Sequence, residues 1–264
     1  MKGWLAALLV LGGCAPDDRA DGPRPTIVSL NPCSDAILSR VTRPGQLLAV
    51  SHFSHSPRAT SMPLEEARRF PATGGTVEEV LALDPDIVVG DPFMAPATRA
   101  SFERLGIRVE TVDIASSPAA SLGQVRQLAA LAGAPEQGER LVDEIETALK
   151  ETRRAGVVPA LLWQQGGLVG GDGSLVAAML AHTGFASHAA ARGMGQGAYL
   201  PLEQVLADPP QVILAAGSER MLRHPALRAL EGVRYERIDP ALLYCGGPTI
   251  PRLARRLAEV KEAL

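Results

Sequence analysis

The sequence lacks the features that mark several large classes of protein. Its 26 lysines and arginines are outnumbered by 29 aspartates and glutamates, so it has no basic excess with which to neutralise nucleic-acid phosphates. It contains no P-loop, no Gly-x-Ser-x-Gly sequence and no His-Glu-x-x-His sequence. The apolar run at residues 3–11 is less than half the roughly 20 residues that a membrane-spanning helix needs. We therefore expect neither a nucleic-acid-binding protein nor an enzyme that uses one of these motifs.

Aromatic and cysteine residues are also scarce. Aromatic residues make up 4% of the chain, so each one is informative, and there are only 3 cysteines. Apolar residues make up 46% and charged residues 21%, which is close to the average for globular proteins and excludes disorder over most of the chain. The 264 residues are enough for one large domain or two smaller ones.

The N-terminus has the pattern of an export signal. Lys2 precedes the short apolar run, and small residues follow it. The tetrapeptide Leu11-Gly12-Gly13-Cys14 resembles a bacterial lipobox, in which the cysteine thiol accepts a lipid. The alternative is an ordinary secretory signal in which Cys14 has no role. We expect residues 1–14 to be the signal and lipobox, with Cys14 as lipid anchor, and residues 15–25 to be a flexible tether.

Two blocks of sequence recur in the same order in the two halves of the chain. Residues 77–89 align with residues 202–214, and residues 106–113 align with residues 232–239 at nearly the same offset. The alternative is that any unit of helix, proline and strand converges on such strings. The recurrence predicts two half-chains of similar structure.

The local pattern in both halves is that of strands alternating with helices. Short, wholly apolar strands are expected at residues 87–89 and 212–215, each preceded by a helix that ends before a proline. Further strands are expected at residues 26–30, 47–50, 107–112, 160–163 and 233–238. The fold class is therefore α/β, with two βαβ lobes that contain parallel sheets.

A long helical stretch separates the halves. It covers residues 119–132 and 135–154, and Leu141, Ile145, Ala148 and Leu149 lie at helical spacing in its second part. A helix of about 20 residues reaches about 30 Å, which is enough to join two lobes rigidly.

These elements resemble a known family, the class III periplasmic binding proteins that serve ABC importers of vitamin B12 and ferric siderophores. The resemblance rests on residues 27–35, residues 78–88 and their second-half counterpart at residues 202–214. It implies an N-terminal lobe at residues 26–117, a connecting helix at 118–155 and a C-terminal lobe at 156–264, with a ligand cleft between the lobes. It also implies a monomeric periplasmic receptor without catalytic residues or a resident cofactor.

The resemblance also assigns two glutamates to permease docking. Glu78 and Glu203 match the pair, one in each lobe, that in the vitamin B12 receptor contacts arginines of the permease dimer. The alternative is that both are first-turn glutamates favoured by the helix dipole.

The cleft residues are expected in the loops that follow the strands, because ligands bind at the carboxyl ends of parallel strands. We expect ligand contacts from the following residues: Asn31, Cys33, His52, Phe53, His55, Phe93, Trp163, Tyr199, Tyr244 and Cys245.

The histidines and cysteines among them leave alternatives open. His52 and His55 could bind a metal or be ordinary loop histidines that only form hydrogen bonds. A disulfide between Cys33 and Cys245 is expected to clamp the cleft shut, so free thiols or small buried residues are favoured. The alternative is a mixed Cys/His metal site that the two cysteines form with His52.

The expected ligand is a metal chelate. Few basic residues stand in the proposed cleft loops, among them Arg58 and Arg192, which favours a neutral or weakly charged ligand: a corrinoid such as cobalamin first, then a ferric siderophore, then haem. Two rival functions are a receptor for a bare transition-metal ion and an exported enzyme with a cysteine nucleophile.

Overall fold

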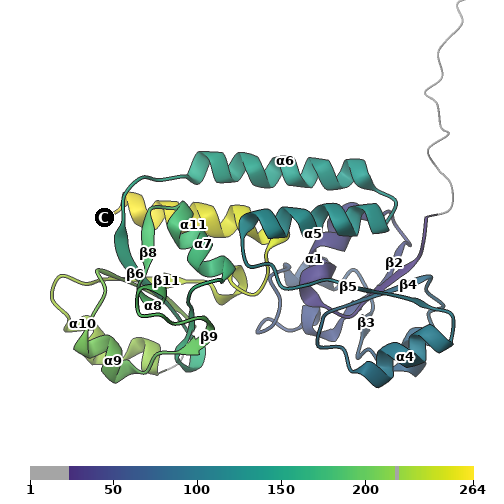
Figure 1. Ribbon diagram of the computed structural model, residues 1–264, viewed down its shortest axis with the longest axis horizontal. Coiled ribbons are helices and arrows are strands. Elements are labelled where there is room, and N and C mark those ends of the chain that lie inside the picture. Colours follow the sequence, from purple (N-terminus) through teal and green to yellow (C-terminus); the bar gives the residue numbers. More distant parts are fainter. Residues whose placement is uncertain (1–23, 218–219) are drawn as a thin grey trace, which may run out of the picture.

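The computed structural model describes residues 24–217 and 220–264. Cys14, the predicted signal segment and most of the predicted tether lie outside the described residues. Two lobes, each built on its own sheet, lie next to each other, and a group of long helices runs along one side of both (Figure 1). The predicted two-lobe α/β fold is therefore confirmed.

The first lobe contains a five-stranded parallel sheet with the order β3-β2-β1-β4-β5. Its strands β1 and β4 are wholly buried, as expected for a parallel sheet covered on both faces. Its strands are β1 (Ile27–Ser29), β2 (Leu47–Ser51), β3 (Ala72–Thr73), β4 (Ile87–Gly90) and β5 (Arg108–Thr111). Its helices are α1 (Pro32–Val41), α2 (Leu64–Ala67), α3 (Val77–Leu81) and α4 (Pro96–Arg104).

The second lobe contains a six-stranded sheet with the order β11-β10-β6-β7-β9, and β8 pairs with β6 outside this path. Its strands are β6 (Val158–Gln164), β7 (Leu168–Gly170), β8 (Phe185–Ser187), β9 (Gln196–Tyr199), β10 (Val212–Ala216) and β11 (Arg234–Ile238). Its helices are α7 (Leu175–His182), α8 (His188–Ala191), α9 (Leu202–Ala207), α10 (Pro225–Arg228) and α11 (Ile250–Glu262). Since β7 pairs antiparallel with both β6 and β9, this sheet is mixed, and the prediction of a purely parallel sheet was wrong here.

The sequence repeat corresponds to a structural repeat. Strands β1, β4 and β5 are adjacent in the first sheet, and β6, β10 and β11 are adjacent in the same way in the second. Each outer strand carries an ion pair at the same place, Arg108 with Glu110 at 2.5 Å and Arg234 with Glu236 at 2.7 Å. Helices α3 and α9, which precede β4 and β10, are therefore equivalent elements.

Two helices, α5 (Pro118–Leu131) and α6 (Pro135–Thr152), occupy the predicted connecting stretch. Helix α5 begins at a proline after the capping residue Ser117, whose hydroxyl accepts a hydrogen bond from the Ala120 N–H. It ends before Gly133, which adopts a positive φ of 64°. Figure 1 shows α6 along one side of the molecule, with α5 and α11 beneath it.

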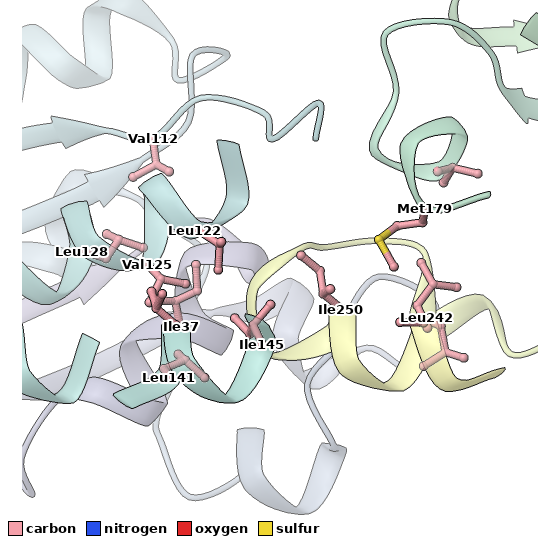
Figure 2. Close-up of a cluster of buried hydrophobic side chains, with 14 of the residues drawn as sticks. Ile37, Val112, Leu122, Val125, Leu128, Leu141, Ile145, Met179, Leu242 and Ile250 are labelled. Carbon is pink, nitrogen blue, oxygen red and sulfur yellow. The ribbon is translucent and has the colours of Figure 1, made fainter. Parts of the chain in front are cut away.

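The two lobes share one hydrophobic core around these helices. Figure 2 shows Ile37 of the first lobe and Met179 and Leu242 of the second in the same cluster as Ile145 of α6. Leu141 and Ala148, predicted to face the core from α6, are buried as well. Because the core is continuous, packing as well as chain connectivity fixes the position of one lobe against the other.

Candidate functional site

A pocket of about 420 Å³ lies where the two lobes meet. The first lobe contributes residues that follow β1, β4 and β5, which all end at the same edge of the sheet. The second lobe contributes residues at the end of β6, on β7 and β9, and in the loop at residues 243–246. The predicted residues among its lining are Asn31, Cys33, Phe93, Tyr244 and Cys245.

Asn31 joins two strand ends at the wall of the pocket. Its side-chain oxygen caps α1 by accepting hydrogen bonds from the backbone N–H groups of Cys33 at 2.8 Å and Ser34 at 3.1 Å. Its amide nitrogen donates to the Asp91 carboxylate, which follows β4, at 3.3 Å. Asn31 therefore fixes the loop after β1 against the loop after β4.

Phe93 presents an exposed aromatic ring to the pocket. The Phe93 N–H donates to the Asp91 carboxylate at 2.8 Å, which holds the turn that carries the ring. The side chain is 78% exposed although it is large and apolar. Such a ring can cover the face of a flat ligand.

Amide side chains surround the pocket on several sides. Asn31 comes from the first lobe, Gln124 from α5, and Gln164 and Gln196 from the second lobe. Gln124 also donates to the Asp113 carbonyl and so holds the loop after β5. Each amide can both donate and accept hydrogen bonds.

The charged residues of this pocket are all acidic. Asp91 and Asp113 line it, and no lysine, arginine or histidine does among the residues that the structure describes. Ser34 also lines it, and the buried Ser34 hydroxyl has no hydrogen-bond partner within the described part of the chain. That hydroxyl is closed off from solvent and so is not exposed to a ligand in the pocket.

A second cavity of about 430 Å³ adjoins the first, because Tyr244 lines both. Its charged lining residues are Arg58 from the first lobe and Arg237 and Asp239 from the second. Burial raises the pKa of the Tyr244 phenol, the nearby Asp239 charge raises it further, and Arg58 opposes both effects. The phenol is therefore a neutral hydrogen-bonding group between two cavities of different charge.

The expectation of free thiols was wrong, since Cys33 and Cys245 form a disulfide across 212 positions of sequence. The prediction assumed that such a bond would close the mouth of the cleft. Instead, the loop that carries Cys245 packs against the first lobe and helix α5: the Cys245 N–H donates to the Ser61 hydroxyl at 3.0 Å and the Gly247 N–H to the Ser121 hydroxyl at 2.6 Å. The disulfide thus lies where the lobes already touch, and it excludes both cysteines as metal thiolates or nucleophiles while it is intact.

Four other predicted residues lie outside the pocket. His52 and Phe53 stack on each other with ring centroids 4.1 Å apart on a 3₁₀ turn after β2. A ring nitrogen of His55 lies 3.1 Å from the Ala67 carbonyl and 3.2 Å from that of Phe70, so this histidine holds α2. Tyr199 is 67% exposed at the end of β9. The structure does not bring these side chains into contact with the pocket.

Trp163 is a core residue. It is fully buried in the second lobe, and its indole N–H donates to the Leu200 carbonyl at 2.9 Å. Side chains alternate along β6, so Trp163 packs with Leu161 on one face of the sheet, while the next residue, Gln164, reaches the pocket. The expectation that Trp163 contacts the ligand was therefore wrong.

Several lining residues were not predicted. Asp113 directly follows the predicted strand at residues 107–112. The expectation that pocket residues follow the carboxyl ends of strands could therefore have identified it. Gln124 lies on a helix and Ser34 inside the first turn of another, and no local sequence signal marks either as a pocket residue.

Neither a metal cluster nor a membrane span appears in the described residues. No group of three or more His, Cys, Asp and Glu side chains is placed to hold a metal ion within residues 24–217 and 220–264. No helix in those ranges has the length and apolar character needed to cross a bilayer.

Two lobes on separate sheets, joined by rigid helices and enclosing a pocket at their strand ends, define the architecture of a class III solute-binding protein. The family model for periplasmic binding proteins matches residues 27–238, and the chain belongs to that family. A search of curated proteins finds no match.

Solved structures of the same architecture are similar over nearly their full length. A periplasmic haem-binding protein of Roseiflexus sp. RS-1 is 22% identical, with 91% of this chain and 98% of that chain covered and a TM-score of 0.69. The periplasmic vitamin B12-binding protein of Vibrio cholerae is 17% identical, with the same coverage and a TM-score of 0.71. The periplasmic haem-binding protein of Vibrio cholerae is 18% identical, with 89% and 98% covered and a TM-score of 0.73. At these identities the likeness shows the fold.

Proposed function

We propose that this chain is an exported receptor that binds a metal chelate, preferably a corrinoid, and delivers it to the permease of an ABC transporter. The observation that carries the choice of ligand is the pocket lining, in which four amide side chains and two carboxylates occur with no cationic side chain among the described residues.

A corrinoid suits this lining chemically. The rim of a corrin ring carries several carboxamide groups, which donate and accept hydrogen bonds as the pocket amides do. The flat macrocycle matches the exposed ring of Phe93 and the half-buried ring of Tyr244.

The other ligands are less well matched. A strongly anionic ferric siderophore would meet Asp91 and Asp113 in the pocket. A bare metal ion would need a cluster of ligating side chains, and the described residues hold none.

Haem is the second candidate, and one observation favours it. Tyr244 places a phenol in the cleft, and tyrosine is among the side chains that hold haem iron in proteins. Four of the similar structures are of periplasmic haem-binding proteins. The raised pKa of Tyr244 opposes the phenolate that iron prefers, and this places haem after corrinoids.

Thermal shifts with a panel of ligands test the proposal. The panel contains cobalamin, cobinamide, haem, several ferric siderophores and zinc chloride. A ligand at 100 times its Kd stabilises the native state by about 2.7 kcal/mol, so the true class should raise Tm clearly. A shift with corrinoids alone supports the proposal. A shift with haem or a siderophore alone refutes the corrinoid assignment, and a shift with zinc alone refutes the chelate receptor.

We also propose how the receptor is held and where it docks. Cys14 would carry the lipid that anchors the periplasmic protein to a membrane, and the receptor would act as a monomer. Glu78 and Glu203 would meet the permease dimer, since both are exposed in the first turns of the equivalent helices α3 and α9.

A further inference from the structure

We propose that the cavity lined by Arg58 and Arg237 binds the anionic arm of the chelate, so that a corrinoid that carries a phosphate binds more tightly than the same corrinoid without it. The inference rests on the proposed function and adds a second subsite, with its own chemistry, to the amide-lined pocket.

The first step is the geometry of the cleft. The arginine-lined cavity continues from the amide-lined pocket at Tyr244. Its walls come from both lobes, with Arg58 from the loop after β2 and Arg237 from β11. A ligand whose macrocycle fills the first pocket can therefore extend an arm past Tyr244 and meet both lobes at once.

The second step is the state of the charges. Neither the Arg58 nor the Arg237 guanidinium has an ion pair or hydrogen bond within residues 24–217 and 220–264, whereas Arg234 and Arg256 are both paired with Glu236. The one acid in the cavity, Asp239, accepts a hydrogen bond from the Ala241 N–H at 3.0 Å and caps the turn at Pro240–Leu242. Within the part of the chain that the structure describes, the cavity thus has two guanidinium groups without an ion pair and one engaged carboxylate.

The third step is the contrast between the two cavities. The amide-lined pocket holds Asp91 and Asp113 and repels an anion, while its neighbour attracts one. Guanidinium groups bind phosphate oxygens through paired N–H donors. This separation of charge orients a chelate that has a neutral or cationic ring and an anionic arm.

Cobinamide and cobinamide phosphate form the matched pair of probes, because they differ only in the phosphate. We expect titration calorimetry on the purified protein to give a Kd for cobinamide phosphate about tenfold lower, a difference of about 1.4 kcal/mol. The ratio of the two Kd values should fall as salt is added, since the cavity is open to solvent and the charges are screened. Equal affinities for the two probes at low salt would overturn the inference.

Substitutions identify the groups responsible. Arg58→Ala, Arg237→Ala and the double variant should bring the ratio of Kd values close to one. Arg255→Ala, on the exposed side of α11 and outside both cavities, is the matched control and should keep the wild-type ratio. If the arginine variants keep that ratio, the inference is wrong. If they weaken both probes equally, Arg58 and Arg237 act on folding or on the whole ligand instead, and the inference is again wrong.

A second experiment separates this inference from the identity of the chelate. If neither corrinoid binds and haem does, the corrinoid proposal fails, and haem is compared with its dimethyl ester, which lacks the two carboxylates. Tighter binding of haem than of its ester, lost in the double arginine variant, supports the anionic subsite. Equal binding of haem and ester, or no binding of any chelate, overturns it.

Discussion

Asp35 is a buried carboxyl group that organises the turn after β2. It is fully inaccessible to solvent, and one carboxyl oxygen accepts hydrogen bonds from the Ser51 N–H at 2.9 Å and the Ser54 hydroxyl at 2.6 Å. The other oxygen has no partner among the described residues. Burial raises the pKa of Asp35 from 3.8 to about 8, although hydrogen bonds from the Ser54 hydroxyl and the Ser51 N–H oppose the rise. At neutral pH this side chain is therefore a protonated acid.

The raised pKa of Asp35 predicts a pH-dependent stability. Between pH 3.8 and about 8 the folded protein keeps a proton that the unfolded chain releases, so stability falls as pH rises through this range and levels off above it. Asp35→Asn removes this titration. In urea unfolding at several pH values, the free energy of unfolding of the variant should rise relative to that of the wild type as pH increases, by at most about 1.4 kcal/mol per pH unit.

Asp86→Asn is the control, because the pKa of Asp86 is shifted in the opposite direction to that of Asp35. Hydrogen bonds from the Thr26 N–H and hydroxyl lower the pKa of Asp86 below 3.8, so its contribution is complete above that pH and is lost as pH falls through the folded value. The difference in free energy of unfolding between Asp86→Asn and the wild type should stay constant between pH 4 and pH 8. A constant difference for Asp35→Asn as well would contradict the assigned pKa.

Single residues were the hardest feature to predict from sequence. Loop positions after strands correctly indicated Asn31 and Phe93 as pocket residues, because strand ends at one sheet edge converge. The same rule included Phe53 and Tyr199, which do not line the pocket, since a loop position does not fix the direction of a side chain. Trp163 lies one place before Gln164 on β6. Because side chains alternate along a strand, Trp163 faces the core while Gln164 lines the pocket.

Among the elements, helices α3 and α9 are equivalent in sequence and in place. In α3 the neighbouring glutamates have different roles. Glu79 accepts hydrogen bonds from the Thr73 hydroxyl at 2.8 Å and the Gly74 N–H at 2.7 Å, whereas Glu78 is exposed and forms no such bond within the described residues. Glu78 is therefore available to a partner protein, as is the exposed Glu203 of α9.

The docking proposal predicts a separation of binding from transport. Glu78→Arg combined with Glu203→Arg should leave the Kd for the chelate unchanged and reduce uptake in whole cells to background, because two repulsive charges replace two attractive ones at the permease. Glu151→Arg, an exposed change on α6, should leave uptake intact. Normal uptake by the double variant, or a weakened Kd, would refute the docking role.

Elements with a strong apolar pattern were predicted well. The core strands β4 and β10 match the predicted runs closely because both are wholly buried. Strands β7 and β9 were missed, since they are short, rich in glycine and pair antiparallel at one side of the second sheet. Residues of both strands line the pocket. Residues 193–199 were expected at the cleft, but as a loop and not as a strand.

At the scale of the whole molecule, three connections hold the lobes together: helix α6, the shared core and the disulfide. Cys33 and Cys245 close a loop of 212 positions, so reduction restores much conformational freedom to the unfolded chain. We expect Cys33→Ser with Cys245→Ser to lower the free energy of unfolding by about 2–4 kcal/mol. In urea unfolding, a reductant should lower the free energy of unfolding of the wild type by a similar amount and leave that of the variant unchanged.

If a reductant lowers the free energy of unfolding equally in the variant and in the wild type, the assigned role of the disulfide is wrong.

Sequence alone could not reveal the pairing, because it depends on the docking of residues 243–249 against α1 and α5. That docking is a contact between elements at opposite ends of the described chain, and no local pattern encodes it.

The same disulfide turns most of the chain into a covalent ring. A protease that cuts the exposed segment between α6 and β6 would break the backbone and still release no fragment, because the two pieces remain joined through Cys33 and Cys245. Residues before position 33 lie outside the ring on one of those pieces. A nicked receptor would thus keep both of its halves joined to the same N-terminal segment until the disulfide is reduced.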